Sequence, residues 1–244
     1  MSTKKAVLGL KTVLWIAALL PAAWLARGLM QSDLGPNPIE TLTRVTGMTA
    51  LVLLLVTLAV TPFRRVTGWN PVIKLRRPLG LFAFFYALMH FSIWFVFDMV
   101  FNVQYMIEDI AERKYITVGM AALLVLIPLA VTSTRGWIRR LGKKWSTLHK
   151  GVYLATALAV VHYFWLVKAD TRLPVLLAVC LVALLLVRLP VFAPGGTSRK
   201  GREGRRGGSS GPTARPAGPS EGEAPASVGQ GVEDDVDAEG VRIG

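Results

Sequence analysis

The stretch "WSTLHKGVYLATALAVVHYFWLVKAD", residues 145–170, contains an apolar segment long enough to cross a bilayer, yet it carries His149 and His162. A transmembrane helix needs about 20 mainly apolar residues. The chain has three histidines, and the third, His90, lies in another apolar segment, "GLFAFFYALMHFSIWFVF". Because ionisable side chains are costly to place in lipid, histidines in such segments indicate a functional site.

The hydropathy of the whole chain indicates a membrane protein. Its 244 residues are 52% hydrophobic and have a mean hydropathy of +0.47, which is too apolar for an ordinary soluble domain. Only helices and closed barrels satisfy their backbone groups in lipid. We therefore predict an all-α integral membrane protein, with six transmembrane helices in a bundle over residues 1–192. The predicted spans are residues 8–27, 45–62, 79–100, 117–133, 149–167 and 174–192.

The first apolar segment has an alternative interpretation as a cleaved signal peptide. Lys4 and Lys5 precede it, as basic residues precede the apolar core of a signal. The segment is long for such a core, and Trp24, Leu25 and Arg27 make a poor cleavage site, because cleavage requires small residues. We predict a membrane span here, and a model with five spans is the alternative.

The last part of the chain differs in composition from the rest. Residues 193–244 are rich in Gly, Pro and Ser, and they carry seven basic and eight acidic residues. The net charge of +13 therefore comes from residues 1–192, which carry 21 basic and seven acidic residues. A segment with so few large apolar residues cannot bury enough surface to fold. We predict a disordered cytoplasmic tail over residues 193–244.

Basic residues concentrate in two of the predicted loops, and neither loop contains an acid. The positive-inside rule places these two loops and both termini in the cytoplasm. A basic charge distributed in this way is a topology signal that also suits an anionic lipid surface. We therefore predict membrane lipid, and no nucleic acid, as a partner. The basic residues of the two loops are Arg64, Arg65, Lys74, Arg76, Arg77, Arg135, Arg139, Arg140, Lys143 and Lys144.

The predicted topology places the histidines at two levels. At a rise of 1.5 Å per residue, His90 lies about 16 Å and His162 about 21 Å from the cytoplasmic ends of their helices. His149 lies at the cytoplasmic rim of the fifth segment. Two histidines at comparable depth, on helices that run in the same direction, can face each other across a shared site.

Four roles are compatible with histidines in these places: haem ligation, metal transport, proton relay and polar packing between helices. Metal transport and proton relay usually require carboxylates or thiolates as well, and none of the seven acids of residues 1–192 lies in mid-segment. Facing imidazoles between apolar helices suit the axial ligands of a haem, whose porphyrin needs a dry slot. We predict haem ligation by His90 and His162, and polar packing is the alternative.

We call the level of His90 and His162 the deep level and that of His149 the shallow level. The shallow level has one histidine where the deep level has two. His149 precedes His162 by thirteen residues, and the residue thirteen before His90 is Arg77. Arg77 is a candidate contact for a haem propionate, a candidate weak ligand opposite His149, or an ordinary loop cation. Thirteen residues make about 3.6 turns, so His149 and His162 share one face only if the fifth helix is kinked or tilted.

Four strings carry a family resemblance: "RRPLGL", "YALMHFSIWF", "TSTRGWIRRLGKKWSTLHKGVYL" and "VVHYFWLVKAD". They resemble the MsrQ (formerly YedZ) family, the haem-binding membrane subunits of the methionine-sulfoxide reductase MsrPQ system. The resemblance covers about residues 8–192. It implies a six-span haem domain of the ferric-reductase and NADPH-oxidase type, with His90, His149 and His162 as the haem ligands.

The resemblance also implies a role in electron transfer, as the partner of a catalytic subunit. Electrons from quinol or from a cytoplasmic flavin reductase would pass to a periplasmic molybdopterin reductase, MsrP, which reduces methionine sulfoxide in oxidised proteins. The implied cofactors are one or two haems b and flavin mononucleotide (FMN), although no stretch of this sequence identifies a flavin site. The implied location is the inner membrane of a Gram-negative bacterium.

Two other functions stay open from the sequence. A stand-alone ferric or oxygen reductase is disfavoured, because enzymes that resemble this core carry a fused FAD and nicotinamide domain, which residues 193–244 cannot form. A haem-free transporter or assembly factor, which uses its histidines for packing, is the other possibility. The colour of the purified protein separates this last function from the haem proteins.

Overall fold

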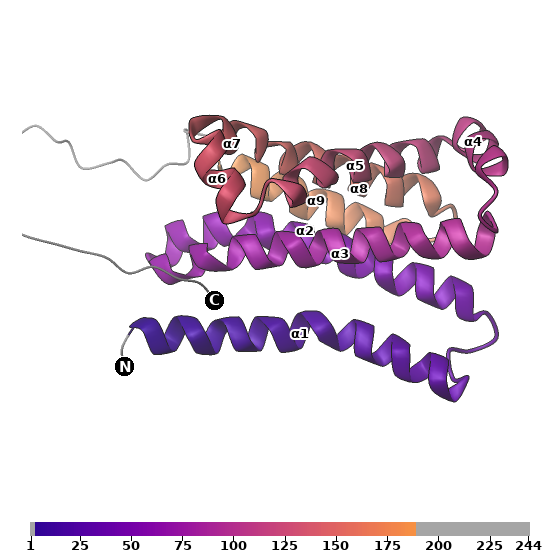
Figure 1. Ribbon diagram of the computed structural model, residues 1–244, viewed down its shortest axis with the longest axis horizontal. Helices are drawn as coiled ribbons and strands as arrows, with labels where there is room; N and C mark the ends of the chain where they lie inside the picture. Colours follow the sequence, from indigo (N-terminus) through magenta and orange to yellow (C-terminus); the bar gives the residue numbers. More distant parts are fainter. Residues whose placement is uncertain (1–2, 189–244) are drawn as a thin grey trace, which may run out of the picture. The chain divides into compact units, whose positions relative to one another are not determined.

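The structure is a computed structural model that describes residues 3–188 (Figure 1). All regular structure in these residues is helical, as predicted. The tail predicted for residues 193–244 lies outside the described residues. The elements are α1 (Thr3–Gln31), α2 (Pro38–Thr67), η1 (Asn70–Leu75), α3 (Arg76–Ile93), η2 (Trp94–Asp98), α4 (Val103–Glu112), α5 (Lys114–Val131), α6 (Arg135–Leu141), α7 (Lys143–Leu148), α8 (Gly151–Leu166) and α9 (Arg172–Leu186).

Each predicted apolar segment contains a helix within the described residues: α1, α2, α3 with its π-helical extension η2, α5, α8 and α9. Residues 189–192 of the predicted sixth span lie outside the described residues. Within residues 3–188, four helices are long and apolar enough to cross a membrane. They are Val7–Gln31, Pro38–Thr67, Asn70–Asp98 and Lys114–Val131. The other two are shorter, with 16 residues in α8 and 15 in α9. The chain is therefore an integral membrane protein whose regular structure within residues 3–188 is helical, and four of these helices have the length and composition of a span.

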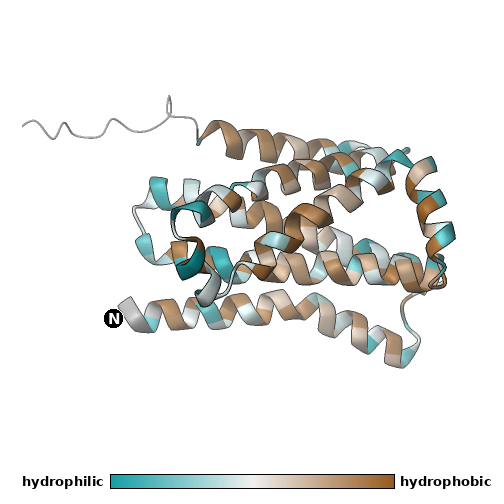
Figure 2. Ribbon diagram, turned by 45° about the horizontal axis from the view of Figure 1, so that its top comes forward, coloured by the Kyte–Doolittle hydropathy of each residue, from teal (hydrophilic) through white to brown (hydrophobic). Residues whose placement is uncertain are grey.

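Local sequence explains where a long helix such as α2 begins and ends. It begins at Pro38, after Asn37, whose side chain accepts a hydrogen bond from the Glu40 backbone N–H. It ends at Gly68, where a φ of 68° reverses the chain without steric cost. Hydrophobic residues make up most of the length of the helices, and hydrophilic residues are more frequent near the helix ends (Figure 2). The apolar stretches therefore lie between polar ends, as a bilayer requires.

Two antiparallel helix pairs form the centre of the fold. α2 packs along α3 and α5 packs along α8, and the pairs meet where α3 contacts α5 and α2 contacts α8 (Figure 1). One buried residue from each of these four helices contributes to a central apolar cluster, formed by Leu54, Ala83, Leu126 and Ala155. Both alanines are 0% exposed, so the helices approach closely at this level.

A tyrosine of α3 attaches α1 to the rest of the fold. The Tyr86 hydroxyl donates a hydrogen bond to the Ala18 carbonyl (2.6 Å) and accepts one from the Ala22 N–H (3.0 Å). Pro21 lies inside α1 and has no N–H, so the regular ladder of the helix is already interrupted there. The α1 helix is bent along its length (Figure 1), and a side chain that inserts at such an interruption holds the bend in place.

An arginine ties the end of α9 to two other helices. Arg188 donates to the Tyr153 hydroxyl on α8 and to the Leu58 carbonyl on α2. Pro62 stands four residues after Leu58 and has no N–H, so this carbonyl lacks its usual helical donor. The arginine therefore satisfies an acceptor that the proline leaves unpaired.

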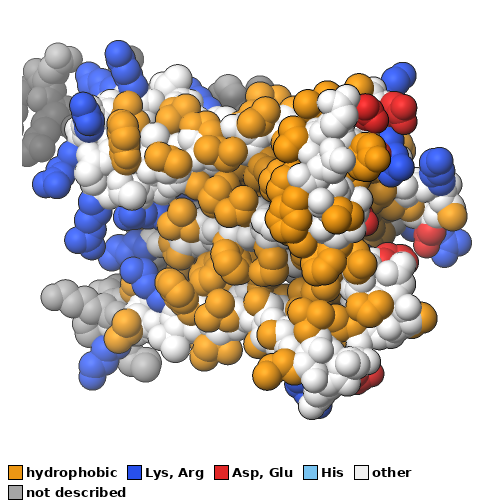
Figure 3. All heavy atoms as spheres, turned by 45° about the vertical axis from the view of Figure 1, so that its right-hand side comes forward, with side chains coloured by type: hydrophobic (Ala, Val, Ile, Leu, Met, Phe, Trp, Pro, Cys, Tyr) orange, Lys and Arg blue, Asp and Glu red, His pale blue; other side chains and the backbone are white. Residues whose placement is uncertain are grey.

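Charged side chains lie mainly at the two ends of the helices. On the face in Figure 3, most Lys and Arg side chains gather at one end, and the Asp and Glu side chains lie at the other. The predicted basic loops contain the short elements η1, α6 and α7, and the helix α4 lies at the acidic end. The sequence prediction did not include these four elements.

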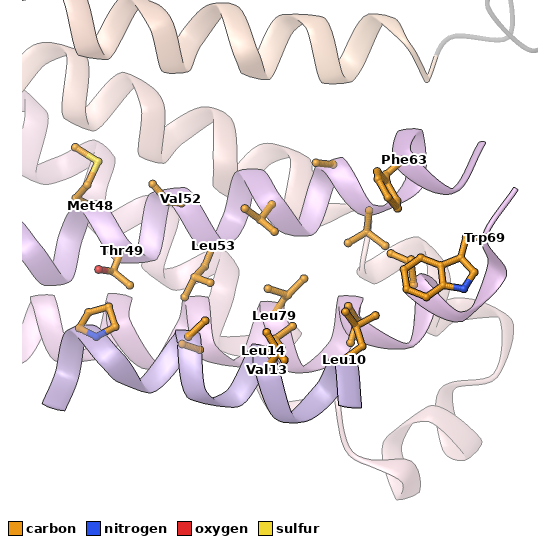
Figure 4. Close-up of a pocket in the computed structure, with 18 residues that line it drawn as sticks. Leu10, Val13, Leu14, Met48, Thr49, Val52, Leu53, Phe63, Trp69 and Leu79 are labelled. Atoms are coloured by element: carbon orange, nitrogen blue, oxygen red, sulfur yellow. The ribbon is translucent and has the colours of Figure 1, made fainter. Parts of the chain in front are cut away.

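An apolar groove lies between α1 and α2 and extends to η1 and the start of α3 (Figure 4). Its volume is about 670 Å³. Its walls are hydrophobic except for Thr49 and Trp69, which carry a hydroxyl and an indole N–H. Since α1 and α2 both have outward-facing apolar side chains beside it, the groove is accessible to a lipophilic molecule. The remaining wall residues include Leu10, Val13, Leu14, Val52, Leu53, Phe63 and Leu79.

The fifth apolar segment does not begin as predicted. We expected one helix over residues 149–167, but α8 begins at Gly151 and His149 caps the C-terminus of α7. The backbone N–H of His149 donates to the Trp145 carbonyl, and that of Lys150 donates to Thr147, so both residues complete the last turn of α7. Because the helix is interrupted between α7 and α8, the phase of His162 does not set the orientation of His149.

Candidate bis-histidine centre

The imidazoles of His90 and His162 lie together in the structure. His90 is on α3 and His162 is on α8, with ring centres 6.2 Å apart and ring planes at 81°. The Nδ1 atom of His90 lies 2.9 Å from the Thr43 carbonyl oxygen of α2. That of His162 lies 2.6 Å from the Tyr115 carbonyl oxygen at the start of α5. Each ring therefore uses Nδ1 to bind the neighbouring helix, which leaves Nε2 available as a metal ligand.

The separation of the two rings fits a shared metal ion. A bond from an imidazole nitrogen to a metal is about 2 Å long. The ring centre lies about 1 Å further from the metal, so two axial imidazoles have centres about 6 Å apart. The observed 6.2 Å agrees with this value. Within residues 3–188, no group of three or more His, Cys, Asp or Glu side chains is placed to hold a metal ion.

Two glycines allow the imidazoles to lie directly against the neighbouring helices. A Cβ atom on Gly47 of α2 would lie 2.9 Å from Nδ1 of His90. A Cβ atom on Gly119 of α5 would lie 2.7 Å from Nδ1 of His162. Each glycine stands four residues after the carbonyl that its histidine contacts. A side chain at either position would therefore obstruct the approach of the ring to that carbonyl.

The two halves of the centre are equivalent under a shift of 72 residues. The shift relates Thr43 to Tyr115, Gly47 to Gly119, and His90 to His162. It also relates the members of the central apolar cluster, Leu54 to Leu126 and Ala83 to Ala155. The pair α2 and α3 and the pair α5 and α8 thus present matching groups to a site between them. The sequence prediction missed Thr43, Gly47, Tyr115 and Gly119, and the equal spacing of 43 residues between each glycine and its histidine was the signal that could have identified the glycines.

His149 lies in a different environment from the other two histidines. Its ring stacks on Trp145 with centres 4.0 Å apart, and its Nδ1 lies 3.1 Å from the Trp145 carbonyl oxygen. Its Nε2 lies 3.4 Å from the Ser133 hydroxyl at the end of α5. Burial lowers the pKa of His149, against smaller opposing effects of its backbone contacts. The neutral imidazole, which is the form that binds metals, is therefore favoured.

The structure does not bring Arg77 into contact with His149. Arg77 is exposed at the start of α3, and no hydrogen bond in the described part of the chain joins the two side chains. The shift of 72 residues nevertheless relates Arg77 to His149 and Thr61 to Ser133. The Thr61 hydroxyl is buried and has no hydrogen-bond partner within residues 3–188. The shallow level therefore has matching positions in the two halves, but different chemistry.

A chain of polar contacts leads from the deep pair to the acidic end. The Tyr115 ring lies 6.1 Å from the His162 ring, between centres. The Tyr115 hydroxyl accepts a hydrogen bond of 3.3 Å from Arg113, which forms an ion pair of 2.9 Å with Asp109 of α4. This hydrogen bond raises the pKa of Arg113 and keeps it charged. Tyr115, whose carbonyl contacts His162, is thus also linked through Arg113 to Asp109 of α4.

Comparisons with known proteins place the chain in a family. A family profile described as "Ferric reductase like transmembrane component" matches residues 46–160. A protein of Herminiimonas arsenicoxydans named "Protein-methionine-sulfoxide reductase heme-binding subunit MsrQ" is 49% identical over 183 residues, which are 74% of this chain and 84% of the relative. A protein of the same name from Rhodospirillum rubrum is 48% identical over 180 residues, which are 73% and 86% of the two chains. The family predicted from the sequence is thereby confirmed: the chain belongs to the MsrQ family of protein-methionine-sulfoxide reductase heme-binding subunits.

Proposed function

We propose that this protein binds haem b in the membrane and transfers electrons to a periplasmic molybdopterin reductase of the MsrP type, which repairs oxidised methionine residues. The observation that carries the proposal is the pair of facing imidazoles of His90 and His162, 6.2 Å apart between ring centres. A haem held there supplies a reversible one-electron acceptor inside the bilayer. The chain itself would then be the electron-transfer subunit rather than the catalytic one.

The contacts of the two histidines prepare them for iron. The carbonyl groups of Thr43 and Tyr115 are acceptors, so each Nδ1 must carry the proton that it donates. The proton on Nδ1 leaves Nε2 with a free lone pair in the neutral imidazole. A hydrogen bond of this kind orients a ligand and increases its basicity. The protein thus fixes both the tautomer and the direction of each ligand before a metal is bound.

We propose the shallow level as the place where electrons enter. The apolar cluster of Leu54, Ala83, Leu126 and Ala155 separates it from the deep pair. On α3, the thirteen-residue step from Arg77 to His90 corresponds to about 20 Å. His149, with Arg77 as a second group, is the candidate ligand set for a second haem at this level. A flavin such as FMN, with His149 as a hydrogen-bond partner, is the alternative occupant.

The proposed topology has six spans, with the basic end in the cytoplasm of a bacterium and the membrane as its inner membrane. The separation of basic and acidic side chains in Figure 3 supports this orientation. At 1.5 Å per residue, the 16 residues of α8 cover about 24 Å, and the adjoining residues extend this length toward the width of the bilayer core. Both termini would then be cytoplasmic.

The electron donor is proposed to be a quinol or a cytoplasmic flavin reductase. The groove between α1 and α2 supports a quinol, because it is apolar along its length and reaches Thr49, two residues from the Gly47 that contacts His90. Among the described residues, no hydrogen bond involves the Thr49 hydroxyl, so it is free to bind a quinol oxygen. The basic surface of α6 and α7 supports a soluble reductase.

A reduced-minus-oxidised spectrum of the purified protein, with quantitation of haem, tests the proposal. We expect the absorbance of a low-spin haem b, at one or two haems per chain. A colourless protein that folds and inserts into the membrane would overturn the proposal and favour a haem-free role. Transfer of electrons from the reduced protein to an MsrP-type reductase, with no transfer to ferric iron, would distinguish the proposed function from that of a ferric reductase.

A further inference from the structure

The plane of each deep imidazole is fixed by two contacts with the neighbouring helix. The bond from Nδ1 to a backbone carbonyl sets the direction in which the ring points. The glycine beside that bond limits rotation, because its Cα faces the same edge of the ring. A Cβ atom would lie 3.0 Å from Cε1 of His90 at Gly47, and 2.9 Å from Cε1 of His162 at Gly119. Each ring therefore lies flush against a helix and has little freedom to turn.

The two fixed planes are nearly perpendicular, at 81°. His90 is held by α2 and His162 by α5, so the angle between the rings follows from the directions of two different helices. It does not depend on a molecule bound between the rings. The protein therefore determines the mutual orientation of its two candidate ligands before any cofactor is present.

We propose that Gly47 and Gly119 are positioning residues that hold the axial imidazoles of a haem perpendicular to each other. This inference rests on the proposed haem ligation by His90 and His162. The plane of an axial imidazole determines which of the iron dπ orbitals it interacts with. Two imidazoles with parallel planes interact with the same dπ orbital, so the energies of the two dπ orbitals differ. Two imidazoles with perpendicular planes interact with different dπ orbitals, so the two orbital energies stay nearly equal.

This difference has a spectroscopic consequence. Oxidised low-spin iron with nearly equal dπ orbitals gives a highly anisotropic electron paramagnetic resonance (EPR) signal, with its largest g value at unusually low field. Iron with parallel ligand planes gives an ordinary rhombic signal with a smaller spread of g values. The EPR spectrum of the oxidised protein thus reports the angle between the rings, independently of electron transfer to any partner.

An alanine at either glycine should turn its imidazole. The new methyl group would press on the Nδ1–Cε1 edge and weaken the bond from Nδ1 to the carbonyl. The space is tighter at Gly119, where the third nearest atom of His162 would be 3.2 Å away, than at Gly47, where that of His90 would be 3.6 Å away. We therefore expect a larger change for Gly119→Ala than for Gly47→Ala.

The experiment compares EPR spectra of the oxidised haem-loaded protein and its variants in detergent, with the haem content measured for each. The deep haem is isolated in a His149→Ala background, in which a shallow haem would be lost. Gly80→Ala is the matched control, because Gly80 lies on the same helix as His90 and has no atom within 4 Å of a Cβ. We expect a highly anisotropic signal from the parent and from Gly80→Ala. Both Gly47→Ala and Gly119→Ala should show a shift toward the rhombic signal while they retain low-spin haem.

The outcomes separate this inference from the proposed function. Absence of low-spin haem from the wild type would refute haem ligation itself. A rhombic signal from haem-loaded wild type would overturn the perpendicular arrangement but leave the ligation intact. Unchanged anisotropy in both glycine variants at full haem content would show that the glycines do not set the angle. If the alanine variants lose haem, the wild-type signal still decides the inference: a highly anisotropic signal supports the perpendicular arrangement, and a rhombic signal overturns it.

Discussion

Trp145 stacks on His149, with ring centres 4.0 Å apart and planes at 28°. The indole N–H donates to the Thr132 carbonyl (3.0 Å), which anchors Trp145 to the end of α5. The histidine is therefore held by an aromatic platform in the interrupted segment between α7 and α8, and not by the face of a membrane helix. This placement makes the shallow histidine a separate unit whose properties can be changed without altering the deep pair.

Replacement of Trp145 should affect the shallow level alone. Trp145→Ala removes both the stacking surface and the hydrogen bond to Thr132, so His149 loses its orientation. We expect slower reduction of the protein by its donor, by about tenfold, while the spectrum of the deep haem stays unchanged. Trp137→Ala is the control, because Trp137 is an exposed tryptophan of the neighbouring helix α6. Equal loss of electron entry in both variants would contradict a specific role for Trp145.

The deep histidines should behave as a pair. His90→Ala and His162→Ala should each abolish the low-spin haem b, because an axial pair fails when either ligand is removed. The double variant should be no worse than either single variant. Haem quantitation and the visible spectrum provide the measurement. Full haem content with an unchanged spectrum in both single variants would show that the two imidazoles are not ligands.

The shallow level can be completed by a single substitution. Arg77 is the counterpart of His149 under the shift of 72 residues, so Arg77→His would place histidines at the corresponding positions of both halves. If a haem is bound there, it should shift toward low spin. Arg77→Ala should weaken binding at this level without a change in the deep haem. One haem per chain in the wild type and in His149→Ala, with electron entry lost in the variant, would instead favour a flavin or quinone at this level.

The groove between α1 and α2 can be tested by filling it. Val52→Trp places a large side chain in the groove, and it should prevent reduction of the haem by a quinol analogue while reduction by dithionite continues. Leu124→Trp is the control, because Leu124 is exposed on α5 and is not part of the groove wall. Rapid reduction of Val52→Trp by quinol would exclude the groove as the donor site and leave the basic surface of α6 and α7 as the candidate.

The sequence was sufficient to predict the main apolar helices and the proximity of His90 and His162. Apolar length defines a membrane helix, and a constant rise per residue converts position into depth, so His90 and His162 could be placed at comparable levels. The groups that hold them, such as the Thr43 carbonyl and Gly47, could not be predicted in this way. A backbone carbonyl is present at every residue and therefore gives no signal in the sequence. A glycine matters here because it has no Cβ atom, and the sequence does not show which glycines lie against a histidine ring.

The position of His149 shows a second limit of prediction from sequence. Hydropathy includes residues 149–167 in one apolar segment, but hydropathy does not report an interruption of the backbone. The interruption depends on tertiary contacts of α7, namely the hydrogen bond from Trp145 to Thr132 and the contact of His149 with Ser133. For this reason, neither the end of α7 nor the orientation of His149 could be derived from helix periodicity.

The attachment of α1 provides a prediction about stability. Tyr86 is 0% exposed, and its hydroxyl is bonded to the Ala18 carbonyl and the Ala22 N–H beside Pro21. Tyr86→Phe would leave two backbone groups unpaired between packed helices and should lower the free energy of unfolding by about 1–3 kcal/mol. Tyr105→Phe is the control, because Tyr105 is 62% exposed.

The measurement is unfolding of the purified protein in a mild detergent by increasing amounts of a denaturing detergent. It is followed through the haem absorbance and the tryptophan fluorescence, to which Trp15 and Trp24 of α1 contribute. Because Ala18 and Ala22 are four residues apart, α1 could pair them directly if it straightened. The variant would then lose the bend without a loss of stability, and α1 would move relative to Tyr86. Unchanged stability together with unchanged tryptophan fluorescence would contradict a structural role for the Tyr86 hydroxyl.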